Sequence, residues 1–237
     1  MLVNVESLVS AISKVVEDAT RAFHSLGSFD NFVIARLSHV NHWQALYIEY
    51  TASFTNYQLE HFTMDDLHYL RLALSCARNS PPKPTNFRVG AVLYSPSSSP
   101  QILTTGYTLE SPGNTHAEQT CFLKLGATHG ISPSEDGAVE SELGHLLPED
   151  VVLYTTMEPC NKRSVGNLTC VERILRLKRR DGRPAIAKVV CGVSEPEKFV
   201  GANVGKKRLE EAGIVVVNVP GLEDEILEVA TAGHEKE

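Results

Sequence analysis

The stretch VVLYTTMEPCNKRSVGNLTCVERILRLKRR (151–180) decides the fold of this chain. Its first seven residues, 151–157, form a short apolar run rich in β-branched and aromatic side chains, which predicts a buried strand. Cys160 follows this strand, and Cys170 comes after a spacer of nine residues. The segment VERILRLKRR (171–180) is expected to continue as a helix. A strand that leads through two cysteines into a helix indicates part of an α/β domain.

The same alternation of strands and helices continues on both sides of this stretch. Upstream, Thr63-x-x-Asp66 predicts a capping box that opens a helix, and a second helix is expected to begin near His116. Residues 126–150, rich in Gly, Ser, Pro and acidic side chains, are expected to form a loop. The other expected elements are a hairpin of RVGAVLY (88–94) and ILTTGYT (102–108), strands AKVVCGV (187–193) and IVVVNV (214–219), and helices KKRLEEAG (206–213) and LEDEILEVA (222–230). This order predicts an α/β fold, a three-layer α/β/α sandwich with helices on both faces of one sheet.

The N-terminal quarter of the chain differs from the rest because it has no catalytic motif. Leu8, Ile12, Val15 and Ala19 recur at helical spacing, so residues 1–60 are expected to form a helical extension. Residues 61–237 then form the main domain. The extension is expected to pack on the main domain or on a second subunit, and the alternative is a lid over the active site.

Composition narrows the class of function. The 237 residues carry a formal net charge of −7, which disfavours a protein that binds a long nucleic acid through many phosphates. No apolar run is long enough to span a bilayer, so no membrane partner is expected. Residues 1–20 lack the basic region and cleavage site of a secretory signal, so we expect a cytoplasmic protein that can also be nuclear. Five cysteines in such a chain indicate metal or core roles rather than disulfides.

Two short motifs carry candidate chemistry. His116 and Glu118 flank one alanine at an expected helix start, and Pro159-Cys160 is followed by Cys170. Zinc takes nitrogen and thiolate ligands, and a catalytic site uses three protein ligands and leaves the fourth position open. The sequence therefore predicts that His116, Cys160 and Cys170 hold Zn²⁺. Both motifs are expected at helix starts, whose positive dipole ends favour thiolates, and Glu118 lies near the metal without being a ligand.

The order of these motifs resembles the signature H-x-E…P-C-x-x-C of zinc-dependent deaminases of the cytidine-deaminase type. The resemblance implies that Glu118 moves protons between an attacking water and an amino-bearing ring, with release of ammonia. Zinc assists by lowering the pKa of a bound water to about 7. The competing interpretation makes His116 a helix-capping residue and the two cysteines buried apolar thiols, which requires three ligands in this order by coincidence. Core positions are expected for Cys76, Cys121 and Cys191, and solvated positions for His129, His145 and His234.

The nine-residue spacer departs from the two-residue spacing of that signature. A long spacer resembles the pyrimidine deaminases of riboflavin biosynthesis, and is most similar to the fungal-type monofunctional enzymes. NFRVG (86–90) resembles their N-P-x-V-G segment, with Phe87 in place of Pro, and MEPC (157–160) resembles their L-E-P-C. The resemblance covers residues 63 to 195 and implies 2,5-diamino-6-ribitylamino-4(3H)-pyrimidinone 5'-phosphate as substrate. The family commonly assembles as dimers or larger oligomers, which implies a homodimer.

Substrate-binding residues are predicted in the spacer and before the first strand. Lys162 and Arg163 place two cations after Cys160, while Gly166 and Asn167 allow a tight turn with exposed amides, so a phosphate can bind there. The alternative is a solvated surface loop. Asn86 resembles the family's substrate-binding asparagine, whose amide can bind a ring carbonyl or a sugar hydroxyl, and the alternative is a simple turn residue.

Other functions stay open from the sequence. A tRNA adenosine deaminase is disfavoured by the net acidity and the long spacer, and a free cytidine, cytosine or guanine deaminase is a further enzyme class. A non-enzymatic alternative is an inactive deaminase-like subunit with structural zinc. Glu118 argues against it, because a structural site needs no proton shuttle.

Overall fold

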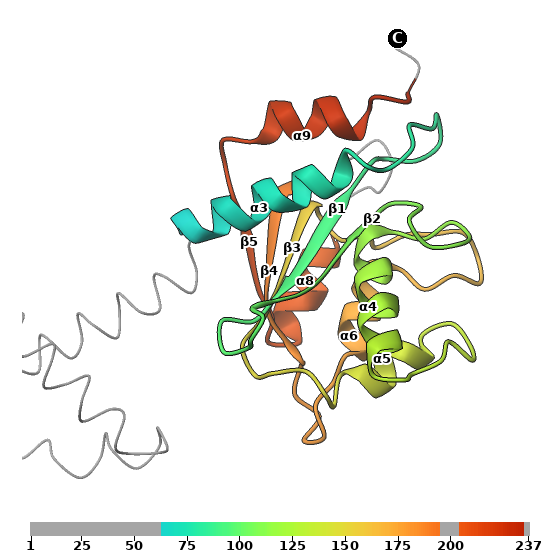
Figure 1. The fold of residues 1–237 in the computed structure, drawn as a ribbon, viewed down its shortest axis with the longest axis vertical. Coiled ribbons are helices and arrows are strands. Elements are labelled where there is room, and N and C mark those ends of the chain that lie inside the picture. The colour runs from blue at the N-terminus through green and yellow to red at the C-terminus, as the bar shows by residue number, and fades with distance from the viewer. Residues whose placement is uncertain (1–62, 195–203, 235–237) are drawn as a thin grey trace, which may run out of the picture. The chain divides into compact units, whose positions relative to one another are not determined.

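A mixed five-stranded sheet organises the computed structural model, which describes residues 63–194 and 204–234 (Figure 1). The strands are β1 (Gly90–Tyr94), β2 (Ile102–Tyr107), β3 (Val151–Met157), β4 (Ile186–Val193) and β5 (Val215–Asn218). The helices are α3 (Met64–Ala77), α4 (Ala117–Thr128), α5 (Ala138–Leu143), α6 (Cys170–Arg176), α8 (Val204–Glu211) and α9 (Glu223–Ala230). The spatial order of the strands is β2-β1-β3-β4-β5. The predicted α/β class is therefore confirmed.

Strand directions divide the sheet into an antiparallel and a parallel half. β1 pairs antiparallel with both β2 and β3, and the β1–β2 pair is the expected hairpin. β3, β4 and β5 run parallel, joined by α6 and α8. In the parallel half, the carboxyl ends of the strands share one edge of the sheet, where ligands commonly bind in open α/β folds. Cys160 follows the carboxyl end of β3 at this edge.

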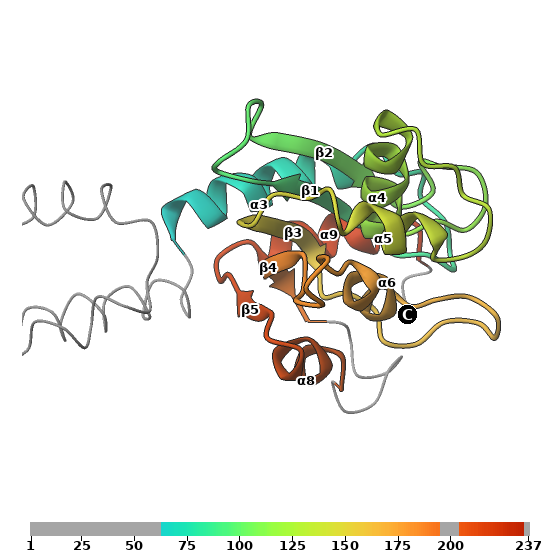
Figure 2. The same ribbon diagram turned by 90° about the horizontal axis from the view of Figure 1, so that it is seen from below.

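Alternating side chains along the strands fill two separate cores. Along β1, Ala91 and Leu93 face the helices α4, α5, α6 and α8, whereas Val92 faces α3 and α9. Figure 1 shows α3 and α9 on one side of the strands and α4, α5 and α6 on the other, and Figure 2 shows the strands following one another from β2 to β5. Strand side chains point to alternate faces, so strands buried on both sides read as nearly continuous apolar runs. Helices on both faces confirm the predicted three layers.

α3 begins as the sequence predicts. Thr63 caps it, with the Thr63 hydroxyl accepting from the Asp66 backbone N–H at 3.2 Å and the Asp66 carboxylate accepting from the Thr63 backbone N–H at 2.7 Å. At its other end the helix lies close to β1. A Cβ on Gly90 would come within 1.9 Å of the Ala73 carbonyl oxygen, so glycine allows this close approach.

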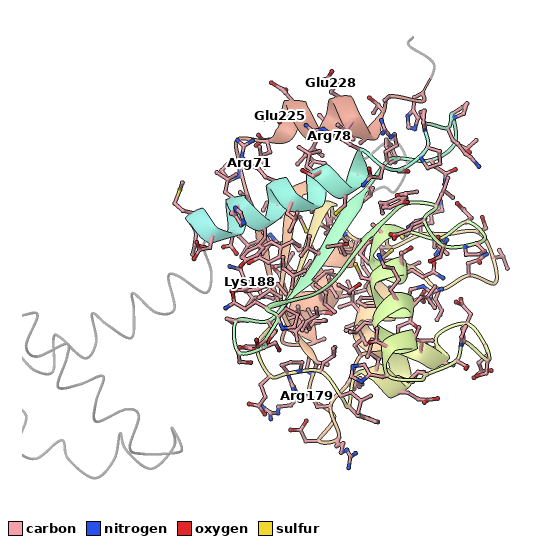
Figure 3. All side chains as sticks on the ribbon, viewed as in Figure 1. Arg71, Arg78, Arg179, Lys188, Glu225 and Glu228 are labelled. Atoms are coloured by element: carbon pink, nitrogen blue, oxygen red, sulfur yellow. The ribbon has the colours of Figure 1, made fainter. Side chains whose placement is uncertain are left out.

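α3 also faces α9 across the surface of the same layer. Figure 3 shows Arg71 and Arg78 of α3 on the side toward Glu225 of α9. The guanidinium–carboxylate distances are 3.5 Å for Arg71 and 3.7 Å for Arg78. All three side chains are about half exposed, so each pair adds at most ~1 kcal/mol to stability. Apolar packing between the helices and the sheet therefore holds this layer in place.

Two element predictions are wrong. Residues 126–150 are not all loop, because α4 continues to Thr128 and α5 occupies Ala138–Leu143. The helix predicted over 171–180 ends at Arg176, after which Lys178 forms a β-bridge with Pro184. Long-range contacts decide the first case, because α5 is a short helix that packs through Val139 and Leu143 into the core.

The predicted helical extension over 1–60 lies outside the described residues, so it and the domain boundary near residue 60 stay predictions. Within the described ranges, no helix combines the length and the apolar character needed to cross a membrane.

Candidate active site

Three elements bring the predicted zinc ligands together. His116 is the N-cap residue of α4, Cys160 follows β3, and Cys170 is the first residue of α6. The prediction that both motifs start helices is right for His116 but wrong for Cys160. Residues 158–169 are not helical, and the helix begins at Cys170 instead. Cys160 therefore approaches the site from the edge of the sheet.

The donor atoms of His116, Cys160 and Cys170 form one cluster. His116 Nδ1 lies 3.4 Å from the sulfur of Cys160 and 3.4 Å from the sulfur of Cys170. All three donor atoms lie within 4.8 Å of one another, and both cysteines are buried. One imidazole nitrogen and two sulfurs are the donors that zinc takes in tetrahedral sites with one open position. The residues present therefore fit a zinc ion.

The two thiols do not hold their protons equally. The hydrogen bond from the Cys170 thiol, together with the approach of His116, lowers the pKa of Cys160 to about 4. The Cys170 backbone N–H, at the start of α6, also donates to the Cys160 sulfur at 3.4 Å. Sharing of a proton with Cys160, and then burial, raises the pKa of Cys170. The start of α6 thus contributes to lowering the pKa of Cys160, ten residues upstream, but less than the Cys170 thiol and His116 do.

Glu118 lies in the first turn of α4 with its carboxyl group against the cluster. Its Oε2 is 3.4 Å from the Cys170 sulfur, and the residue is only 3% exposed. Burial, and then the charge of Cys160, raise the pKa of the Glu118 carboxyl. A carboxyl group whose pKa is raised toward neutrality can both accept and donate protons. Glu118 therefore stands where the sequence predicts it, beside the ligands.

Two local features place α4 and α6 at the site. A Cβ on Gly106 would come within 2.5 Å of the Ala117 carbonyl oxygen, so this glycine lets β2 pass close to the first turn of α4. At α6, Thr169 and Glu172 form a capping box, with the Thr169 hydroxyl accepting from Glu172 N–H at 3.2 Å. This second capping box was not predicted, although Thr169-x-x-Glu172 has the same pattern as the one at Thr63. It fixes where α6 begins, and so where Cys170 lies.

Asn86 lies in the loop before β1 and binds a residue that the sequence did not indicate. Its Nδ2 donates to the Oδ1 of Asn114 at 2.7 Å, two residues before His116. His234 donates to the Asn86 backbone carbonyl at 3.2 Å and packs against Phe87. The prediction that His234 is solvated is therefore wrong, because the C-terminal segment supports this loop.

The spacer residues predicted to bind phosphate separate into two kinds. Arg163 Nη1 donates to Gln119 Oε1 at 3.2 Å and to the Leu168 carbonyl at 3.3 Å, and its Nη2 donates to the Asn114 carbonyl. Arg163 therefore joins the spacer to α4. Lys162 and Asn167 are exposed, and the Asn167 N–H closes a turn onto the Ser164 carbonyl at 3.1 Å.

A buried ion-pair cluster supports the far end of the spacer. Arg173 of α6 is 2% exposed and donates to Glu140 of α5 at 2.7 Å and to Asp136. The second oxygen of Asp136 accepts from the Leu168 backbone N–H at 2.9 Å. The segment 136–140, predicted as loop, thus anchors both α6 and the residue two positions before Cys170.

Comparison with known proteins places the chain in a family. The family profile described as "Cytidine and deoxycytidylate deaminase zinc-binding region" matches residues 63–182, just over half of the chain. The chain belongs to this deaminase family. The match contains His116, Cys160 and Cys170, the residues whose donor atoms form the cluster, and so confirms a zinc-binding domain.

Individual members of the deaminase family extend the likeness beyond the zinc motif. A crystal structure of Aspergillus oryzae Rib2 deaminase, a C-terminal deletion mutant at pH 4.6, is 47% identical, covers 72% of this chain and 93% of that chain, and has a TM-score of 0.62. The same enzyme in complex with DARIPP is 46% identical over 72% of this chain and 92% of that chain, with a TM-score of 0.61.

A curated relative in the deaminase family is the diaminohydroxyphosphoribosylamino-pyrimidine deaminase of Schizosaccharomyces pombe. It is 34% identical over 166 residues, which is 70% of this chain and 35% of the relative. The chain thus spans about a third of the length of this curated relative. The predicted resemblance to the riboflavin-pathway pyrimidine deaminases is confirmed.

Proposed function

We propose that this chain catalyses the zinc-dependent hydrolytic deamination of 2,5-diamino-6-ribitylamino-4(3H)-pyrimidinone 5'-phosphate, a step of riboflavin biosynthesis. The observation that carries this proposal is a buried carboxyl, Glu118, 3.4 Å from a sulfur of a His/Cys/Cys cluster. The substrate is supported by the name of the S. pombe relative and by the A. oryzae structure in complex with DARIPP.

The proposed roles follow from position and charge. His116, Cys160 and Cys170 would hold the zinc, which when bound would lower the pKa of a water molecule to ~7. Glu118 accepts a proton from the attacking water and passes it to the ring nitrogen. It then accepts the second proton of the same oxygen as the carbonyl forms, and passes it to the amine, which leaves as ammonia. Its burial and raised pKa suit a group that changes protonation state several times in one cycle.

We assign substrate recognition to the loop that carries Asn86 and to the spacer between the two cysteines, which together we call the mouth of the site. Asn86 binds a ring carbonyl or a sugar hydroxyl through its amide, and the spacer binds the phosphate through Lys162, Arg163 and Asn167. The terminal nitrogens of Arg163 already donate to protein acceptors, whereas Lys162 is exposed. The Lys162 ammonium group is therefore more available to bind a phosphate, whereas Arg163 mainly joins the spacer to neighbouring loops.

A substrate panel followed by ammonia release tests the proposed reaction. The full chain should deaminate the phosphorylated ribitylamino-pyrimidine and leave cytidine, cytosine, guanine and tRNA essentially unchanged. Efficient turnover of cytidine or a tRNA, with none of the pyrimidine phosphate, would overturn the substrate assignment. Absence of ammonia from every substrate with the zinc site filled would favour an inactive deaminase-like subunit.

Zinc content tests the ligand set. One zinc per chain is expected by elemental analysis of the full chain, and Cys160→Ala or Cys170→Ala should each lose it, because two ligands do not hold a catalytic zinc tightly. Cys191→Ala is the matched control, since this buried thiol lies in β4 and outside the donor cluster. Full zinc in both ligand variants would refute the assignment.

The phosphate site is tested by comparing phosphorylated and dephosphorylated substrate. Charge-assisted contacts are worth roughly ten- to a hundredfold in kcat/KM, so the dephosphorylated compound should be the poorer substrate by that factor. Lys162→Ala and Arg163→Ala should both narrow the gap, with Lys162→Ala disturbing the remaining loops less. An unchanged preference in both variants would place the phosphate elsewhere.

The assembly and location that the sequence indicates complete the proposal. We propose a homodimer, since members of the zinc-dependent family to which the chain belongs commonly assemble as dimers or larger oligomers. We also propose that the protein is cytoplasmic. Light scattering of the purified chain would measure its mass in solution, and a monomer at micromolar concentration would contradict the dimer. Imaging of the tagged full chain would test its location.

A further inference from the structure

Asn114 links two loops at the mouth of the site. Its side-chain Oδ1 accepts from Asn86 Nδ2 at 2.7 Å, while its backbone carbonyl accepts from the guanidinium of Arg163. Asn86 belongs to the loop before β1 and Arg163 to the spacer, so three loops from distant parts of the chain meet at this residue. Asn114 itself lies two residues before His116 and is exposed.

The contact with Asn114 fixes the orientation of the Asn86 amide. Thr85 Oγ1 donates to Asn86 Oδ1 at 3.0 Å, and Asn86 Nδ2 donates to Asn114. A side-chain amide has two N–H donors and one oxygen with two lone pairs. With one donor and one lone pair already used, one N–H and one lone pair remain, and their directions are set. While Asn114 presents its Oδ1, a flipped Asn86 amide would place its oxygen against that oxygen, and this contact is repulsive.

The contact with Arg163 depends on a different part of Asn114. The guanidinium is held by backbone carbonyls of Asn114 and Leu168 and by the Gln119 side chain. No side-chain atom of Asn114 takes part in these bonds. Replacement of the Asn114 side chain therefore separates the two functions, because it removes the partner of Asn86 and leaves the backbone acceptor of Arg163.

We propose that Asn114 is a positioning residue that orients the Asn86 amide for the polar edge of the substrate. This inference rests on the proposed function, in which Asn86 contacts the ring or the sugar. It assigns to Asn114 no direct contact with the substrate and no part in proton transfer. The pre-set amide avoids the cost of ordering a free side chain when the substrate binds.

A double-mutant cycle tests this coupling in the full chain. Asn114→Ala should lower kcat/KM roughly three- to tenfold, the range for loss of one hydrogen bond, mainly through a higher KM. In an Asn86→Ala background the same change should have little further effect, because the amide that it orients is gone. In an Arg163→Ala background the full effect of Asn114→Ala should persist, which makes this background the matched control.

Two further measurements separate positioning from folding. Zinc content and Tm of Asn114→Ala should equal those of the unmodified chain, since the side chain is exposed. Asn114→Asp keeps the acceptor oxygen and should recover kcat/KM on the dephosphorylated substrate to within about twofold, because there its added charge meets no phosphate. Loss of zinc or of Tm in Asn114→Ala would make the role structural.

The outcomes distinguish this inference from the proposed function. Equal effects of Asn114→Ala in the Asn86→Ala and Arg163→Ala backgrounds, or a fall in kcat at constant KM, would overturn the positioning role. Absence of turnover of the pyrimidine phosphate by the unmodified chain would instead refute the proposed substrate, and the cycle would then be measured on the member of the panel that releases ammonia.

Discussion

Asp66 and Glu118 are two buried acids, each 3% exposed, that lie in opposite layers of the molecule. Asp66 opens α3, where its carboxylate accepts from Lys188 Nζ at 2.9 Å and from the Tyr154 hydroxyl at 2.9 Å. Glu118 lies in the first turn of α4, and its carboxyl group accepts from the Cys170 thiol at 3.4 Å. Among the described residues, no lysine or arginine forms an ion pair with Glu118.

The difference between these two acids shows which kind of burial signals function. The Asp66 charge is neutralised by a lysine and satisfied by hydrogen bonds, so its burial stabilises one arrangement of α3 on the sheet. Within the part of the chain that the structure describes, Glu118 has no lysine or arginine partner, and its burial raises the pKa of its carboxyl, a state that costs stability and suits proton transfer. Two equally buried acids thus differ in role: Asp66 stabilises α3 on the sheet, whereas the role proposed for Glu118 is proton transfer.

The largest effect is expected when the Glu118 carboxyl is made unable to carry a proton. Glu118→Gln keeps the shape of the side chain, so Tm and zinc content should be unchanged, while kcat should fall by ~10²–10⁴-fold or more. Stopped assays of ammonia release at saturating substrate would measure the loss. Turnover near that of the unmodified chain would remove Glu118 from the mechanism.

The opposite pattern is expected for Asp66→Asn. This change leaves Lys188 without its carboxylate in a mostly buried position, so the free energy of unfolding should fall by about 3 kcal/mol. The kcat of the folded fraction should stay within about twofold, because Asp66 lies in the layer that does not carry the site. Urea unfolding gives the first quantity. A hundredfold loss of kcat in fully folded Asp66→Asn protein would contradict a purely structural role for Asp66.

The smallest effect concerns Asp136, an acid that is paired but not fully buried. Partial burial works against its ionisation, but hydrogen bonds from Leu168 N–H and Arg173 outweigh burial and lower its pKa. A carboxyl whose folded pKa is lowered stabilises the fold above its unfolded pKa of ~3.9 and loses that contribution as pH falls through the folded value. Asp136→Asn should therefore be less stable than the unmodified chain at pH 7, with the difference shrinking below about pH 4. A difference independent of pH between 7 and 3 would show that the carboxylate charge is not involved.

The metal cluster and the main elements could be predicted because their signals are local. His116 and Cys170 belong to helix starts, and the apolar run of β3 marks the edge at which Cys160 lies. α5 could not be predicted, because six residues form too short a helix to be stable on propensity alone. It depends on the Arg173–Glu140 pair, which joins residues 33 positions apart.

The mouth of the site was predicted less completely, for a related reason. Asn86 and Arg163 were found from their residue types and motifs. Asn114, which joins them, has no such motif, and its contact with Asn86 spans 28 positions. Side-chain contacts across loops depend on the packed structure, so periodicity and spacing do not reveal them. His234 was missed because its partner is a backbone carbonyl 148 positions away.

The spacer between the two cysteines is anchored at both ends and forms an exposed turn in its middle. Arg163 binds α4 and its entry loop, and the Leu168 backbone is held by Asp136, whereas Val165 between them is fully exposed. Gly166 has φ +88°, and a Cβ there would meet no atom within 4 Å. The length of this turn is therefore uncoupled from the geometry of the metal ligands, so insertions can accumulate at its tip during evolution without moving either cysteine. A short epitope or a fluorophore introduced at Val165 would use the same exposed turn, and would place a reporter on the surface between the two cysteine ligands.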